Sequence, residues 1–149
     1  MTSPSHPWTI RPALEQDADR LADIYLGVRR QTFLWVDPGR FYREDFAAHT
    51  QGERVFVCED AHGTIVGFLA LWEPDDFIHM LYILPAFQGQ GAGTALLSAL
   101  PGWPERRYRL KCLVRNTRAI AFYRAIGFEI TGDGASPEGD YKDMRLAGR

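Results

Sequence analysis

The most informative segment of this chain is Leu81-Tyr82-Ile83-Leu84-Pro85-Ala86-Phe87-Gln88-Gly89-Gln90-Gly91-Ala92-Gly93-Thr94. A β-rich run ends at Pro85, which cannot donate to a sheet ladder, and three glycines and a helical pattern follow. Glycines lack the Cβ atoms that keep a ligand away from backbone N–H groups, and the first N–H groups of a helix have no internal partner. The pattern therefore favours a loop that binds a phosphate or diphosphate over a tight turn that binds nothing.

Two common nucleotide-binding motifs fit this stretch poorly. A P-loop needs Lys followed by Ser or Thr directly after its last glycine, whereas Gly93 is followed by Thr94 and Ala95. A dinucleotide fingerprint needs a third glycine where Thr94 stands and a carboxylate at the end of the next strand, but residues 109–114 contain none. An ordinary ATPase or GTPase loop is excluded, and a dinucleotide site is only weakly indicated.

The segments on both sides of the loop read as alternating strands and helices. Period-two and β-branched patterns predict strands at residues 8–11, 54–60, 64–72, 77–84, 109–114, 128–131 and 141–146. Helical spacing predicts a helix through Ala18, Leu21, Tyr25 and Val28, and others at 41–49, after Gly93 through 100, and at 119–126. Residues 32–38 and a Gly, Pro and Asp-rich stretch before Tyr141 read as loops. The expected architecture is α/β of the α+β type, a mixed sheet with helices packed on it.

Bulk properties narrow the functional classes. The 149 residues fit one domain, residues 1–149, and 46% hydrophobic with 24% charged residues is ordinary globular composition. The net charge of -2 predicts neither a nucleic-acid nor an anionic membrane partner. Cys58 and Cys112 lie in apolar runs typical of buried thiols. No secretory signal is visible at residues 1–7, so we expect a soluble cytoplasmic protein.

Two motifs carry a family resemblance. Gln88-Gly89-Gln90-Gly91-Ala92-Gly93 resembles the (Arg/Gln)-x-x-Gly-x-(Gly/Ala) signature of the GNAT superfamily of N-acetyltransferases, and Leu81-Tyr82-Ile83-Leu84-Pro85 looks like the fourth strand of that family. Downstream, Asn116-Thr117-Arg118-Ala119-Ile120-Ala121-Phe122-Tyr123-Arg124-Ala125-Ile126-Gly127-Phe128 resembles its second signature, an Asn followed by Ala, Phe-Tyr and Gly-Phe. The two signatures, in this order and at this separation, are far more specific than either one alone.

The resemblance implies a fold and an activity. It implies a mostly antiparallel mixed sheet of about six to seven strands flanked by about four helices. It further implies acetyl-CoA as co-substrate and direct transfer of its acetyl group to a primary amine of a small molecule, peptide or protein. The alternative is a non-catalytic acetyl-CoA-binding module that regulates a partner. A homodimer is left open, and no metal site is expected.

By the same resemblance, a row of residues would bind the cofactor. Backbone groups of Leu81, Tyr82 and Ile83 would pair with the pantetheine arm, and one N–H near Leu81 would polarise the thioester carbonyl. Asn116 would hydrogen-bond to the same arm, although Asn is also a favoured helix N-cap. The pyrophosphate would be wrapped by Gln88, Gly89, Gln90, Gly91, Ala92, Gly93 and Thr94.

Two catalytic residues are expected, Tyr123 and His79. Tyr123 would protonate the departing thiolate, although core packing alone explains a tyrosine on that helical face. In some family members a Glu at the position of Lys111 serves as the general base. This chain lacks that Glu, so the identity of its general base is left open. His79 is a candidate because imidazole titrates near neutral pH, with a buried structural His as the equal alternative. Further candidates, read more readily as a polar turn, are Glu73, Asp75 and Asp76.

The amine acceptor is not readable from the sequence. The aromatic-rich residues 32–35, the helix at 41–49 and the loop before Tyr141 would form its site by resemblance. Phe33, Trp35 and Tyr42 hint at an apolar wall, which core packing explains equally well.

Overall fold

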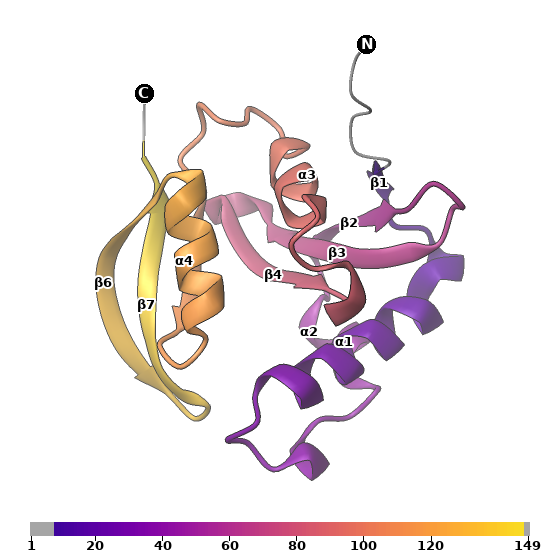
Figure 1. Ribbon diagram of the computed structural model, residues 1–149, viewed down its shortest axis with the longest axis horizontal. Coiled ribbons are helices and arrows are strands. Elements are labelled where there is room, and N and C mark those ends of the chain that lie inside the picture. The colour runs from indigo at the N-terminus through magenta and orange to yellow at the C-terminus, as the bar shows by residue number, and fades with distance from the viewer. Residues whose placement is uncertain (1–7, 148–149) are drawn as a thin grey trace.

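The computed structural model describes residues 8–147, so residues 1–7, where the sequence shows no secretory signal, lie outside it (Figure 1). The strands are β1 Thr9–Pro12, β2 Arg54–Glu59, β3 Ile65–Trp72, β4 Phe77–Ile83, β5 Arg109–Leu113, β6 Phe128–Ser136 and β7 Gly139–Leu146. The α-helices are α1 Ala18–Thr32, α2 Asp45–His49, α3 Ala92–Ser98 and α4 Thr117–Ile126. Short 3-10 turns lie at Glu15–Asp17, Pro38–Arg40, Glu73–Asp75 and Pro85–Phe87.

The seven strands form one sheet in the order β1-β2-β3-β4-β5-β7-β6. Every neighbouring pair is antiparallel except β4 and β5, which run parallel. The predicted mixed, mostly antiparallel sheet with about four helices is therefore confirmed.

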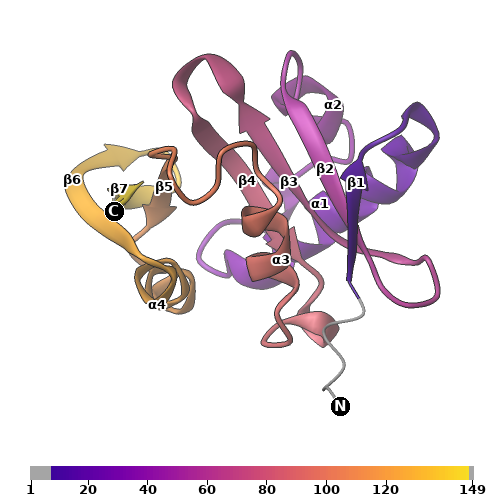
Figure 2. The same ribbon diagram turned by 90° about the horizontal axis from the view of Figure 1, so that it is seen from above.

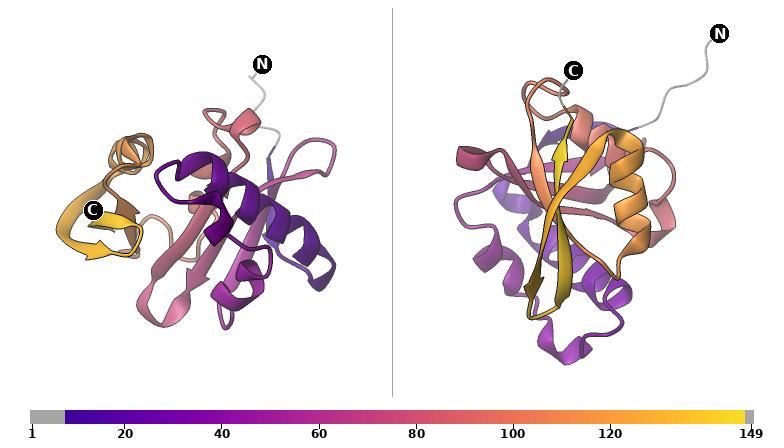
Figure 3. Two further views of the ribbon diagram at one scale, coloured as in Figure 1. Left: turned by 90° about the horizontal axis from the view of Figure 1, so that it is seen from below. Right: turned by 90° about the vertical axis from the view of Figure 1, so that its left-hand side faces the viewer.

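Helices cover both faces of the sheet. Helices α3 and α4 lie on one face, where a hydrophobic cluster extends from Phe56 and Leu69 to Met144 and Leu146. Helices α1 and α2 lie on the other face, where Leu21, Tyr25 and other apolar residues pack on the central strands. Figures 2 and 3 show the two helical layers and the C-terminal strands turned away from β4. The first cluster spans both halves of the sheet and so joins them.

The parallel pair opens into a fork. Strands β4 and β5 pair only at Phe77 with Arg109 and at Ile78 with Leu110. From His79 onward, the β4 edge that faces β5 has no strand partner, while the other edge stays paired with β3 as far as Ile83. The remaining backbone groups on that open edge are available for another ligand.

The last two strands are longer than predicted. The sequence predicts strands at 128–131 and 141–146 around a loop, but β6 and β7 continue until only Pro137 and Glu138 connect them. Gly132 and Gly134, which suggest a loop, lie inside β6. A Cβ atom at Gly134 would lie 2.5 Å from Cζ of Tyr141 and nearer still to its hydroxyl oxygen. Glycine is therefore needed there to let the tyrosine ring cross the strand.

One helix is shorter than predicted and another is shifted along the chain. The helix expected at 41–49 begins at Asp45, because the carboxylate of Asp45 accepts from the backbone N–H of Tyr42 and from the guanidinium of Arg29. Those bonds close a turn where a continuous helix would run. Helix α3 begins at Ala92, inside the glycine stretch, and ends at Ser98. In the part of the chain that the structure describes, every helix falls short of the length and apolar character that a membrane crossing requires.

Candidate active site

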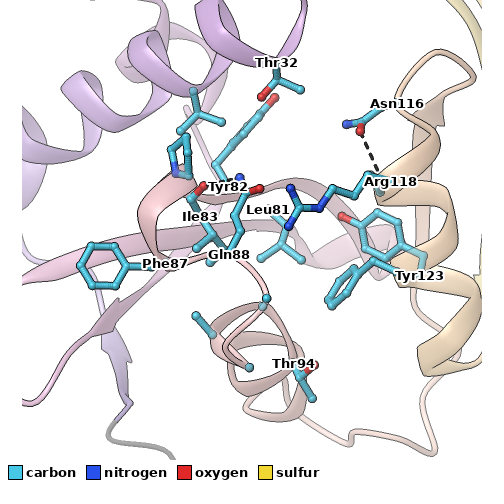
Figure 4. A pocket seen from close by; sticks show the side chains of 18 of the residues that line it. Thr32, Leu81, Tyr82, Ile83, Phe87, Gln88, Thr94, Asn116, Arg118 and Tyr123 are labelled. Atoms are coloured by element: carbon cyan, nitrogen blue, oxygen red, sulfur yellow. Dashed lines mark hydrogen bonds between the residues drawn. The ribbon is translucent and has the colours of Figure 1, made fainter.

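A cavity of about 580 Å³ lies at the mouth of the fork. Its walls are the C-terminal turn of α1, the end of β4, the glycine loop with the start of α3, and the first turns of α4 (Figure 4). The sequence-predicted residues that line it are Leu81, Tyr82, Ile83, Gln88, Gly89, Gly91, Ala92, Gly93, Thr94, Asn116 and Tyr123. The fold thus gathers two motifs that are distant in sequence around one space.

The open edge of β4 presents peptide groups to this space. The N–H of Leu84 donates to the C=O of Val66 on β3. Peptide groups alternate in direction along an antiparallel pair, so those of Tyr82 and Leu84 point toward β3. Those of Leu81 and Ile83 consequently point into the fork. The C=O of Ile83 already accepts a hydrogen bond of 2.9 Å from Nε2 of Gln88, which fixes the loop against the strand end.

The glycine loop exposes a run of backbone donors. Gly89 and Gly91 have φ angles of 78° and 89°, which residues with a Cβ atom rarely adopt. Within residues 8–147, no protein acceptor bonds the backbone N–H groups from Gly89 to Thr94. Five of these six residues line the cavity, and their free N–H groups form a site for anionic oxygen atoms.

Close helix packing brings α4 to the loop. A Cβ atom at Gly93 would lie 3.0 Å from Cζ of Phe122, so glycine lets α3 and α4 approach each other beside the cavity.

Gln90 is the one predicted loop residue that does not line the cavity. Its side chain donates to the C=O of Ala86, and its own C=O accepts from Nε1 of Trp8. Gln90 therefore stabilises the loop from outside.

Asn116 fulfils the alternative role that its residue type suggests. Its Oδ1 caps α4 by accepting from the N–H of Ala119 at 3.3 Å. The same residue lines the cavity, and its Nδ2 group forms no hydrogen bond with the part of the chain that the structure describes. The cap orients the side chain and leaves the amide N–H donors free.

Tyr123 combines burial with access to the cavity. Its side chain is packed between the rings of Phe122 and Phe128, and 9% of the residue is exposed. Burial raises its pKa well above the ordinary value, so the phenol stays protonated across the physiological range. The hydroxyl points into the cavity (Figure 4).

His79 does not line this cavity. It is the extra residue of a β-bulge in β4, and its Nδ1 lies 2.8 Å from a carboxylate oxygen of Glu53. The side chain of Glu53 is 8% exposed and that of His79 is 38% exposed. The alternative candidates Glu73 and Asp76 bind Arg54 and Arg106 by ion pairs, as expected of a polar turn.

Sequence reasoning missed several residues that line the cavity. Val28 and Gln31 come from α1, which is far from either motif in sequence, whereas Thr32 at the end of α1 belongs to the residues 32–35 expected at the acceptor site. Arg118 lies inside the second motif, but that signature assigns it no role. Phe122 is in the same helix. Within the described residues, no group of His, Cys, Asp and Glu side chains is arranged to hold a metal ion.

A comparison with family models matches residues 18–128 to the Acetyltransferase (GNAT) family. The chain belongs to the GNAT family. GNAT enzymes use acetyl-CoA, and this chain is an acetyl-CoA-dependent N-acetyltransferase. The resemblance carried by the two motifs is thereby confirmed.

Known GNAT proteins resemble the chain along most of its length. The N-alpha-acetyltransferase RimI of Mycobacterium tuberculosis is 30% identical over 142 residues, which cover 89% of this chain and 85% of that protein. An aminoglycoside N(6')-acetyltransferase type 1 of Stenotrophomonas maltophilia is 32% identical, with 83% and 87% covered. The fold is similar to that of yncA from Salmonella typhimurium, solved with its cofactor acetyl-CoA, with a TM-score of 0.64, 23% identity, and 94% and 93% covered.

Proposed function

We propose that this GNAT enzyme acetylates a primary amine through the cavity at the β4–β5 fork, with Tyr123 as general acid and His79 as general base. The observation that carries the proposal is the convergence of the unpaired amides from Gly89 to Thr94, the open edge of β4 and the Tyr123 hydroxyl on one cavity. Acetyl-CoA supplies the acetyl group as an activated thioester.

The cofactor would be held by backbone groups. The amides of Gly89, Gly91, Ala92, Gly93 and Thr94 would donate to its diphosphate, and those of Leu81 and Ile83 would pair with the pantetheine arm. Tyr82 would contribute the strand between them, while Gln88 and Gln90 keep the loop in place. Asn116 would donate from Nδ2 to the same arm. The free donors and the volume of the cavity suit a ligand with several acceptor oxygens.

Tyr123 would give its proton to the departing sulfur. A buried phenol with a raised pKa is fully protonated near neutral pH, so the proton is always present. The same burial also disfavours a free thiolate in the cavity. Cys58 and Cys112 are poor nucleophiles because burial raises both pKa values to about 11, which supports transfer without an acyl-enzyme.

The amine must lose a proton before it attacks. An amine of pKa ~10.4 costs about 4–5 kcal/mol to deprotonate at pH 7, which a nearby base offsets. Glu53 holds Nδ1 of His79, so that nitrogen carries the proton and Nε2 can accept one, directly or through water. The backbone of His79 follows directly after Ile78, the last residue of β4 that pairs with β5.

The acceptor would enter beside the segment between α1 and α2. Trp35 in that segment donates from Nε1 to the C=O of Glu138 at 2.6 Å, and Arg115 lies over its indole at 5.6 Å. The segment therefore meets the β6–β7 turn next to the cavity. The relatives are an N-alpha-acetyltransferase and an aminoglycoside acetyltransferase, which supports a primary amine of a small molecule or a peptide.

The compartment is also part of the proposal. Cys58 and Cys112 are both free and buried. Unpaired thiols are typical of reducing compartments and support a cytoplasmic enzyme. Fractionation of the source cells would test this point.

The test is an amine panel with acetyl-CoA that follows release of free thiol. The panel should include amino acids, polyamines, aminoglycosides and short peptides with free N-termini. We expect thiol release with one of these classes and acetylated amine of matching amount by mass spectrometry. Binding of acetyl-CoA without turnover on any amine would instead favour the non-catalytic module.

A further inference from the structure

The cavity has a cationic side chain opposite the glycine loop. Arg118 is in the first turn of α4, lines the cavity, and extends its guanidinium into it (Figure 4). Its Nη2 atom lies 4.0 Å from the position that a Cβ atom would occupy at Gly89. The guanidinium and the loop amides therefore face the same space.

Arg118 is an exposed cation near the positive end of the α4 dipole. Cations near a helix N-terminus are repelled by the positive end of the helix dipole. Across residues 8–147, no carboxylate forms an ion pair with Arg118, and its guanidinium donates to no protein acceptor. The neighbouring Arg115, by contrast, lies over the indole of Trp35. Within the described residues, Arg118 thus faces solvent and the cavity without a protein partner for its charge.

We propose that Arg118 binds a phosphate group of the cofactor from the side opposite the Gly89–Thr94 amides. The inference rests on the cofactor site proposed above. A guanidinium donates two parallel hydrogen bonds to a phosphate, and such charge-assisted bonds are stronger than those of neutral amides. A phosphate held between the loop and Arg118 also neutralises the charge that the helix dipole opposes.

The two-sided contact has a consequence for catalysis. Arg118 and Tyr123 belong to the same helix, and both side chains point into the cavity. A cofactor anchored on Arg118 is thus aligned by the helix that also carries the proposed proton donor. Arg118 is accordingly a cofactor-binding residue, and its removal should weaken binding while leaving the chemical step intact at saturation.

The experiment measures dissociation constants by calorimetry for wild-type protein, Arg118→Gln, Arg118→Lys and the control Arg124→Gln. Arg124 is exposed on the same helix and does not line the cavity. We expect Arg118→Gln to weaken binding of coenzyme A about ten- to a hundred-fold, Arg118→Lys to weaken it less, and Arg124→Gln to leave it unchanged. The affinity of Arg118→Gln should also depend less on potassium chloride concentration.

A second ligand, 3'-dephospho-coenzyme A, identifies the phosphate. If wild-type protein and Arg118→Gln bind this ligand equally, Arg118 binds the 3'-phosphate. If Arg118→Gln binds it more weakly than wild type by the same factor as coenzyme A, Arg118 binds the diphosphate. Equal affinity of both proteins for coenzyme A itself would overturn the inference while leaving the cofactor site intact. Absence of binding to wild-type protein would instead overturn the cofactor site. The ligand-free thermal midpoint of Arg118→Gln should not fall, since removal of the cation relieves the helix dipole.

Discussion

The side chain of Tyr123 suits both core packing and the proposed proton transfer. Its ring lies between Phe122 and Phe128, and its hydroxyl reaches the cavity. The sequence left packing and proton transfer as alternatives because both need a tyrosine on the inner face of the helix. In the structure the packed ring and the hydroxyl that reaches the cavity are different ends of the same side chain, so packing and the proposed proton transfer are compatible.

Replacement of Tyr123 by Phe should separate those roles. The ring contacts remain, so the thermal midpoint and the KM for acetyl-CoA should change little. Loss of the general acid should lower kcat by about a hundred-fold or more. Steady-state kinetics with the best amine of the panel measures both constants. Wild-type kcat in this variant would remove Tyr123 from the mechanism.

His79 allows a test of the proposed general base. If its Nε2 accepts the amine proton, a side chain that cannot accept it leaves the amine without that base. His79→Gln should therefore lower kcat/KM about ten- to a hundred-fold at neutral pH. Glu53→Gln should have a smaller effect, because Glu53 acts through the imidazole.

A matched control for His79 is available in the chain. His62 lies in the exposed turn between β2 and β3, so His62→Gln should behave as wild type. An unchanged kcat/KM in His79→Gln would assign that residue to structure and direct the search to other acceptor-side groups.

Side chains that act through local motifs could be predicted, and those that depend on sheet order could not. The loop amides and Asn116 belong to continuous segments whose residue types determine their geometry. Glu53 is 26 residues from His79, and the pair exists because β2, β3 and β4 are neighbours in the sheet. No local pattern in the sequence carries that information.

At the scale of elements, strand lengths were the weakest part of the prediction. Gly132 and Gly134 carry loop preference, but ladder pairing with β7 outweighs it. The strand–loop–helix unit at β4 and α3 was predicted well, because each of its boundaries has a local cause in Pro85 or in a glycine. Pairing between β6 and β7 determines the length of the hairpin strands, whereas local residue types determine the boundaries of the glycine loop.

The hairpin offers a paired stability test. Gly134→Ala should destabilise the protein by about 1–3 kcal/mol, since the new methyl group overlaps the ring of Tyr141. Gly27→Ala should stabilise it by about 0.5–1 kcal/mol, because Gly27 lies within α1 and a Cβ atom there meets no atom within 4 Å. Urea unfolding measures both. A Gly134→Ala variant as stable as Gly27→Ala would show that Tyr141 can move aside without a loss of stability.

At the scale of the whole molecule, the fork divides the sheet into two halves that few backbone hydrogen bonds connect. Strands β4 and β5 share two residue pairs, while the cluster beneath α3 and α4 continues across the junction. The cavity walls come from both sides of that junction, with β4 and α3 on one side and α4 on the other. A ligand in the cavity therefore adds contacts between two halves that are otherwise connected on one face.

Acetyl-CoA should accordingly raise the thermal midpoint of the protein. A ligand that binds only the folded state at a hundred times its Kd contributes about 2.7 kcal/mol, which for a chain of this size corresponds to a rise of roughly 5–11 °C. At the same ligand concentration, Arg118→Gln should show a smaller rise and Tyr123→Phe a nearly full one, because the first change weakens binding and the second affects proton transfer. Scanning calorimetry at several ligand concentrations distinguishes these cases. A midpoint that does not move at millimolar acetyl-CoA would mean that the amides at the fork do not hold the cofactor, and the assigned roles of Arg118 and Tyr123 would fall with it.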